Sequence, residues 1–266
     1  MIRGLSTTLF GWEQRYRRDG VRRNTAEVLD DCATAGLDAV EIDPVPEVRA
    51  VLDARGLRVS GGYLGLPLGW GIDADTMQER VLPFAARLAA AGATEMVVNT
   101  NAREGLGKSW LRDPDRVRQL SADLGAISDR LAGTGLRLAL HNHCSERDLA
   151  LGELRAVLDC PDGRVGLCLD IGWAHVAGLD VPELAAVHGK RIVALHLRNQ
   201  RGGVPTEDLL EGDLDVGSVV RGLVKGGYRG WMTLELWHPG GMVPSRSMLE
   251  DVRRSVDYVR EAVARA

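Results

Sequence analysis

One pattern occurs four times in the second half of the chain: a short apolar strand with two distinct faces that ends in a histidine or a carboxylate. In residues 136–146, Leu138 and Leu140 lie on one face, whereas Ala139 and His141 lie on the other. The same alternation leads to three further polar residues, Asp170, His196 and Glu235. A closed barrel of parallel strands requires this arrangement, because helices cover its apolar side chains while polar side chains converge inside one end.

The remainder of the chain supplies enough further elements to close such a barrel. Turn and cap signals predict strands at 5–10, 38–42, 57–62, 94–100, 136–141, 164–170, 191–198 and 231–237. Helices are predicted at 25–35, 46–55, 75–91, 114–132, 146–159, from 181, at 215–225 and at 245–264. Eight strand–helix units without a linker predict an α/β fold, a (β/α)8 TIM barrel, as a single domain over residues 1–266. An open, doubly wound sheet is the alternative, but no GxGxxG follows the first strand.

Composition excludes several classes of function. The formal net charge of −4 provides no excess of positive charge for binding a nucleic acid. No apolar run reaches the length of a membrane span, and the N-terminal residues do not form a signal peptide. The four cysteines have no CxxC spacing, which is typical of reduced thiols inside a cell. We therefore expect a cytoplasmic protein with neither nucleic-acid nor membrane partners.

The polar residues at the strand ends predict a metal site. Histidines on strands are often hydrogen-bonded core residues, but buried carboxylates such as Asp170 and Glu235 are uncommon unless they are paired or bind a metal. His141 and His196 end strands at the same mouth of the barrel. Mixed imidazole and carboxylate ligands favour one divalent ion of zinc, manganese, cobalt or iron.

Tryptophans are concentrated near the same mouth. Trp12, Trp70, Trp110, Trp173 and Trp237 all fall at or after the ends of predicted strands. Indole rings can stack on sugar C–H surfaces and donate to hydroxyl groups, although packing at the barrel top is the alternative role. Arg198, on the inward face of its strand, either binds a carboxylate or phosphate of a substrate or forms an ion pair, with Glu41 or with a carboxylate that binds the metal.

The chain resembles the sugar phosphate isomerase/epimerase superfamily, also called xylose-isomerase-like barrels. The resemblance rests on residues 141–146 (HNHCSE), 169–173 (LDIGW), 191–198 (RIVALHLR), 211–215 (EGDLD) and 227–235 (GYRGWMTLE). It implies a (β/α)8 barrel with one divalent metal held by Glu, Asp, His and Glu from strands five to eight. Asp170, His196 and Glu235 match the last three ligands. For strand five, many members have a Glu where this chain has His141, so either His141 or Glu146 is the ligand.

The resemblance also implies an activity, a divalent-metal-dependent isomerase or epimerase of a sugar or keto-sugar that acts through an enediolate. Glu235 would be one base, with Glu146 or His143 facing it, and Trp173, Arg198, Trp12, Trp70, Trp237 and Glu41 would bind substrate. A lyase or dehydratase of a keto-inositol or keto-sugar on the same site is the alternative. An abasic-site phosphodiesterase and a non-catalytic sugar-binding barrel are further alternatives. For the oligomeric state, a homodimer is one of the possibilities.

Overall fold

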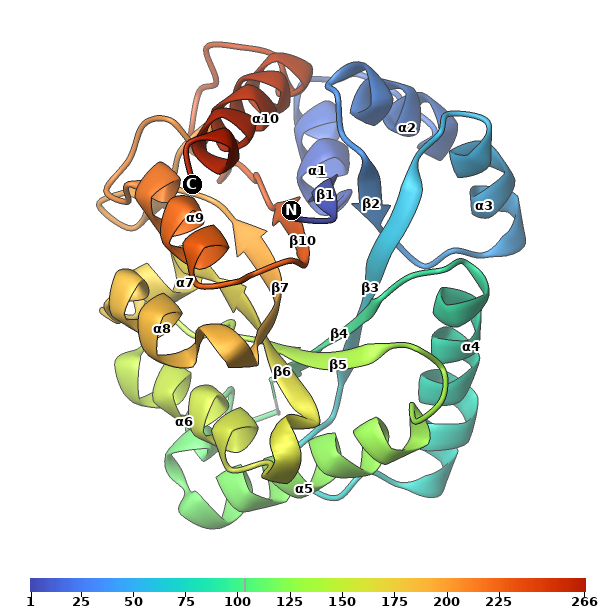
Figure 1. The fold of residues 1–266 in the computed structure, drawn as a ribbon, viewed down its shortest axis with the longest axis vertical. Coiled ribbons are helices and arrows are strands. Elements are labelled where there is room, and N and C mark those ends of the chain that lie inside the picture. Colours follow the sequence, from blue (N-terminus) through green and yellow to red (C-terminus); the bar gives the residue numbers. More distant parts are fainter. Residues whose placement is uncertain (103) are drawn as a thin grey trace.

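The computed structural model describes residues 1–102 and 104–266. Eight parallel strands within them form a barrel (Figure 1): β1 (Gly4–Thr7), β2 (Ala39–Glu41), β3 (Arg58–Leu66), β4 (Glu95–Thr100), β5 (Arg137–His141), β6 (Val165–Asp170), β7 (Ile192–Leu197) and β10 (Trp231–Leu234). The order around the sheet is β1-β10-β7-β6-β5-β4-β3-β2. Strands β1 and β2 complete the circle through a bridge between Thr8 and Glu41 and a 2.9 Å hydrogen bond from Asp38 N to Leu5 O. The predicted TIM barrel is therefore confirmed.

Helices surround the strands (Figure 1). They are α1 (Phe10–Arg18), α2 (Thr25–Thr34), α3 (Pro46–Asp53), α4 (Leu82–Ala90), α5 (Pro114–Arg130), α6 (Arg147–Leu158), α7 (Ile171–Val176), α8 (Val181–His188), α9 (Val216–Lys225) and α10 (Met248–Ala264). Local sequence sets several of their beginnings. Asn24 and Glu27 form a reciprocal capping box at α2, and Asp113 caps α5 ahead of Pro114. Among the described residues, no helix is both long and apolar enough to cross a membrane.

In β5 the two faces of the strand separate as the alternation predicts, whereas in β7 the adjacent Val193 and Ala194 both face inward, against the alternation expected there. Leu138 and Leu140 belong to the large core between the strands and the helices. Ala139 and Cys168 belong to a small cluster of their own with Val97, Val193 and Ala194. The apolar side chains therefore form one layer under the helices and a narrower filling between the strands, which leaves the strand ends to the polar residues.

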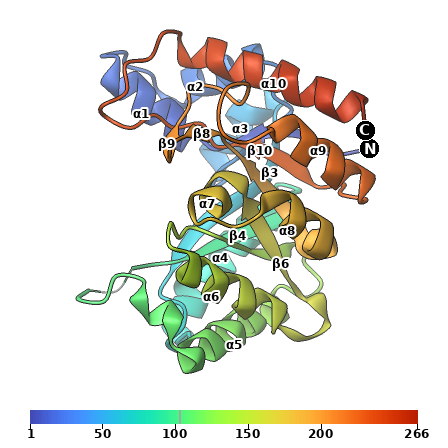
Figure 2. The same cartoon turned by 90° about the vertical axis from the view of Figure 1, so that its left-hand side faces the viewer.

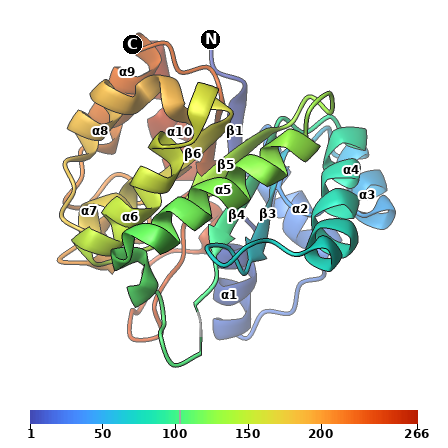
Figure 3. The ribbon, with the colours of Figure 1, turned by 90° about the horizontal axis from the view of Figure 1, so that it is seen from below.

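The two ends of the barrel differ in what they carry (Figures 2 and 3). Both chain termini lie at one end, and α1 lies at the opposite end. Because β1 leads directly toward α1, the α1 end is where the parallel strands finish. In TIM barrels this end carries the functional site.

The structure corrects several element boundaries. The first strand stops at Thr7, and Phe10 starts helix α1. This helix was not predicted, because charged residues surround its few apolar ones. Helix α7 and the short hairpin β8 (Gln200–Arg201) and β9 (Val204–Pro205) were also not predicted. Strand β10 ends at Leu234, so Glu235 and Trp237 follow the strand. The first turn of the helix predicted at 75–91 is a π-helix, Thr76–Val81, that precedes α4.

Candidate metal centre

Four polar side chains converge where β5, β6, β7 and β10 end. Ligand atoms of His141, Asp170, His196 and Glu235 all lie within 4.8 Å of one another. His141 Nε2 lies 3.6 Å from Asp170 Oδ2 and 3.5 Å from Glu235 Oε2, and His196 Nδ1 lies 3.1 Å from Glu235 Oε2. The ladder pairs Asp170 with His196 and Thr233 with His196, which places these strand ends at one level. This set could hold one metal ion.

Unsatisfied polar atoms in this cluster fit a cation. His141 Nε2 and Asp170 Oδ2 are buried and have no hydrogen-bond partner among the described residues. Leaving such atoms without partners costs about 1–3 kcal/mol each, and more for charged groups, so native proteins avoid it. A cation between the two would satisfy both. Two nitrogens and two carboxylate oxygens are a donor set that suits zinc, manganese, cobalt or iron.

Asp170 is held rigidly on its other sides. Its Oδ1 accepts hydrogen bonds from Trp173 N at 2.7 Å and from Arg198 Nε at 3.1 Å. The side-chain amide of Asn142 donates to the carbonyl of Asp170 and accepts from its backbone N–H, at 3.0 and 2.9 Å. These contacts leave only Oδ2 for the cluster. No sequence pattern singles out Asn142 beyond its place beside His141.

Mutual charge effects keep the cluster ionised. Burial alone would raise the pKa of Glu235, but the charge of His196 and the nearby His141 hold it well below the usual range. Burial would lower the pKa of His196, yet Cys168, Glu41 and Glu235 raise it well above its usual value. The pKa of His141 is also raised, because Asp170 and Glu235 outweigh the effect of burial. Before a metal binds, the site therefore favours protonated imidazoles. A cation that binds there would displace their protons.

A cavity of about 510 Å³ opens beside the cluster. Its walls are formed by Thr8, Leu9, Phe10, Glu13, Glu41, Ile42, Asp43, Tyr63, His143 and Glu235. The volume falls within the range of small-molecule sites. Glu235 belongs both to the cluster and to the cavity wall, so a molecule in the cavity would lie directly against the candidate metal site.

Behind His143, which lines the cavity, lie Trp173 and then Arg198. The His143 ring lies 4.6 Å from that of Trp173, edge to face, and 5.6 Å from that of His141. The guanidinium of Arg198 stacks 4.3 Å from the Trp173 ring and is almost fully buried. Desolvation, reinforced by His141, lowers the pKa of His143 to about 4. Arg198 forms an ion pair with Asp170, a member of the four-residue cluster, at 3.1 Å.

The remaining predicted site residues lie in different surroundings. Glu146 is exposed and pairs with Arg112 at 2.5 Å, outside the four-residue cluster. Trp12 is fully buried and donates its indole N–H to Thr7 Oγ1 at 3.2 Å. Trp70 packs edge to face against Trp110 and lies under Arg116. Trp237 is half-buried in the segment after β10. Glu41 lies against His196.

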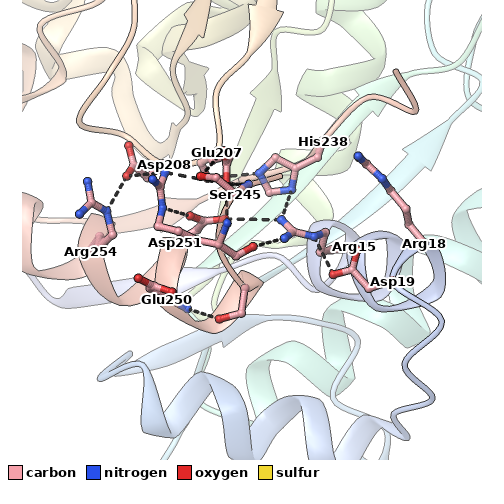
Figure 4. A network of polar contacts seen from close by, with 12 residues as sticks. Arg15, Arg18, Asp19, Glu207, Asp208, His238, Ser245, Glu250, Asp251 and Arg254 are labelled. Carbon is pink, nitrogen blue, oxygen red and sulfur yellow. Dashed lines mark hydrogen bonds and ion pairs between the residues drawn. The ribbon is translucent and has the colours of Figure 1, made fainter. Parts of the chain in front are cut away.

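A polar network anchors the segment that follows Glu235 (Figure 4). His238 Nδ1 lies 3.4 Å from Arg15 in α1, and its Nε2 lies 3.2 Å from the carbonyl of Glu207. Glu207 in turn accepts hydrogen bonds from the backbone N–H and the hydroxyl of Ser245. Asp251 in α10 accepts from Arg246 at 2.7 Å and pairs with Arg15. Sequence patterns could not reveal this network, because its members are far apart in the chain.

Comparisons with known proteins agree with this fold. Residues 29–262 match the sequence profile of a family described as a xylose isomerase-like TIM barrel. The chain therefore belongs to the xylose isomerase-like TIM barrel family. Among curated proteins it is similar to the rhizopine catabolism protein MocC of Rhizobium meliloti, with 28% identity over 214 residues. That match covers 71% of this chain and spans 65% of the length of the relative.

Solved structures share the whole barrel at low sequence identity. The IOLI protein, whose crystal structure contains a zinc atom, superposes with a TM-score of 0.73 at 17% identity, over 98% of each chain. D-allulose 3-epimerase from Methylomonas sp., in complex with D-allulose, gives a TM-score of 0.69 at 17% identity, over 98% of this chain and 96% of the epimerase. The structural neighbours of this barrel thus include sugar epimerases.

Proposed function

We propose that this protein is a divalent-metal-dependent isomerase or epimerase of a sugar or keto-sugar. The observation that carries the proposal is the position of Glu235, which is shared by the four-residue cluster and by the wall of the cavity. A substrate in the cavity would therefore meet the candidate metal ligands and a carboxylate at the same point. The likeness to sugar epimerases supports the choice of a sugar over other small molecules.

His141, Asp170, His196 and Glu235 would hold the ion. When bound there, a divalent metal supplies a Lewis acid that polarises a carbonyl oxygen. The carboxylate of Glu235 is partly exposed, so it can also accept a proton from the carbon next to that carbonyl. His143, on the cavity wall, is the facing group; its pKa of about 4 leaves the imidazole neutral, so it would act there as a base, while Glu235 can return the proton that it accepted. The guanidinium of Arg198, buried against Trp173 and paired with Asp170, would hold that candidate ligand in place.

Metal analysis is the first test. We expect about one divalent transition metal per chain in the wild type, and its loss in Asp170→Ala and His196→Ala. Arg118→Ala, which alters only an exposed ion pair with Asp115, should keep the metal and serves as the control. A wild type that takes up none of zinc, manganese, cobalt or iron would contradict the proposal and would favour a sugar-binding barrel.

Proton exchange is the second test. The loaded protein is incubated in D2O with a panel of ketoses and keto-sugars, and NMR follows deuterium at the carbon next to the carbonyl. Exchange with formation of the isomer or epimer supports the proposal, whereas loss of a hydroxyl group would identify a lyase. Glu235→Gln should abolish the exchange. Exchange that persists in this variant would exclude Glu235 as the proton acceptor.

A further inference from the structure

Glu41 is a buried carboxylate that lies beside the candidate metal centre without belonging to the four-residue cluster. Its side chain is 4% exposed, and its Oε2 lies 3.1 Å from His196 Nε2. The backbone around it is fixed on both sides. Glu41 bridges Thr8 in parallel fashion, and the next residue, Ile42, donates to the carbonyl of Gly61 at 3.1 Å. The closure of the barrel therefore holds in place the backbone that carries this carboxylate.

His196 is held between two carboxylates, one at each ring nitrogen. Its Nδ1 lies 3.1 Å from Glu235 Oε2, which also neighbours His141 Nε2 at 3.5 Å. Its Nε2 points away from that shared oxygen, to Glu41. A neutral imidazole can bind a metal with one nitrogen only while the other carries the proton. In this geometry Nδ1 faces the cluster, and Nε2 must carry the hydrogen that Glu41 accepts.

We propose that Glu41 is a positioning residue that accepts the Nε2–H of His196 and thereby holds the imidazole with Nδ1 free for the metal. The inference rests on the proposed metal site and extends it to a residue outside the ligand set. Carboxylates that hold a metal-binding histidine in this way fix both its tautomer and its ring orientation. Removing such a partner weakens metal binding by about 10–100-fold.

Metal affinity in a set of variants tests this role. Zinc is titrated in competition with a chromophoric chelator against wild type, Glu41→Ala, Glu41→Asp and Glu41→Gln. Alanine removes the hydrogen-bond acceptor, and aspartate, which is shorter by one methylene, moves it away from His196. Both variants should therefore bind zinc about 10–100-fold more weakly than the wild type. Glutamine retains an oxygen at the same reach and should restore most of the affinity. Glu95→Gln is the matched control, since Glu95 is also a buried carboxylate at a strand but has no hydrogen bond to His196.

A second readout separates positioning from a loss of folding. The 15N shifts of the His196 ring in the metal-free protein, followed up to a pH at which the imidazole is neutral, report which nitrogen then carries the proton, with His196→Gln identifying the signals. Wild type should show the Nε2–H form, and Glu41→Ala a mixture of forms. Unchanged zinc affinity and an unchanged tautomer in Glu41→Ala and Glu41→Asp would overturn the inference. A wild type that binds no zinc would instead overturn the proposed function, while the tautomer would still report on Glu41.

Discussion

Arg198 Nε donates to Asp170 Oδ1 across 3.1 Å, and both side chains are almost completely buried. Asp170 therefore uses one oxygen for this contact and for Trp173 N, and presents the other to the candidate metal centre. The ion pair is thus a support for the site as well as a stabilising contact of the fold.

Arg198→Ala should destabilise the metal-free protein. The change leaves the Asp170 carboxylate buried with fewer donors, which costs about 3–5 kcal/mol when a buried pair is broken. Arg198→Lys keeps the charge but loses the planar group that both stacks on Trp173 and donates to Asp170, so an intermediate loss is expected. Urea unfolding in the presence of a chelator measures both effects. Equal unfolding midpoints for wild type and Arg198→Ala would contradict this role.

Gly172→Ala should displace Arg198. A Cβ atom on Gly172 would lie 2.5 Å from Arg198 Cγ and Nε, closer than real contacts allow. Such overpacking costs about 1–3 kcal/mol, and here it would also disturb the hydrogen bond to Asp170. Gly222→Ala in α9 is the control, because no atom lies within 4 Å of its added Cβ and alanine favours the helix. Thermal unfolding should show a lower midpoint for Gly172→Ala alone.

Asp251→Ala should loosen the segment that carries Glu235. The substitution removes the acceptor of Arg246 and a partner of Arg15, which is itself 3% exposed (Figure 4). We expect a loss of about 3 kcal/mol in the free energy of unfolding, together with faster amide exchange over residues 236–246. Arg118→Ala, at an exposed pair, should change stability by less than about 0.5 kcal/mol. Unaltered exchange in this segment would show that the network does not anchor it.

Glu95→Gln should remove a pH dependence of stability. Burial raises the pKa of Glu95 to about 8 in the folded state, from its ordinary value of 4.5. The folded protein thus holds this proton more tightly than the unfolded chain, and stability falls as pH rises between these two values. The free energy of unfolding falls by at most ~5 kcal/mol over this range, since one pKa unit corresponds to about 1.4 kcal/mol.

Unfolding free energies at pH 5, 6, 7 and 8 measure this effect. Wild type should lose stability along the series relative to Glu95→Gln, because glutamine carries no titrating proton. The difference should be small at pH 5, where Glu95 is protonated in the fold, and largest at pH 8. Parallel pH profiles for the two proteins would show that Glu95 titrates normally in the fold.

The sequence by itself determined the barrel and the polar residues at its mouth. Period-2 alternation assigns Leu138 and Leu140 to the helix side and His141 to the interior, because successive side chains on a strand point to opposite faces. The same rule placed Asp170 and His196 at strand ends. Cap residues such as Asn24 and Pro114 fixed helix starts through contacts only a few residues long.

Only the tertiary structure decided which groups meet. Both His141 and Glu146 fitted the fifth strand by sequence, but Glu146 pairs with Arg112 at the surface while His141 enters the cluster. The hydrogen bonds of Asn142 to Asp170 join residues that lie 28 positions apart in the chain. The contact of Glu41 with His196 joins residues that lie 155 positions apart. Such contacts depend on register and on closure of the barrel between β1 and β2. Local periodicity carries no information about either, since it specifies faces of strands and not their neighbours.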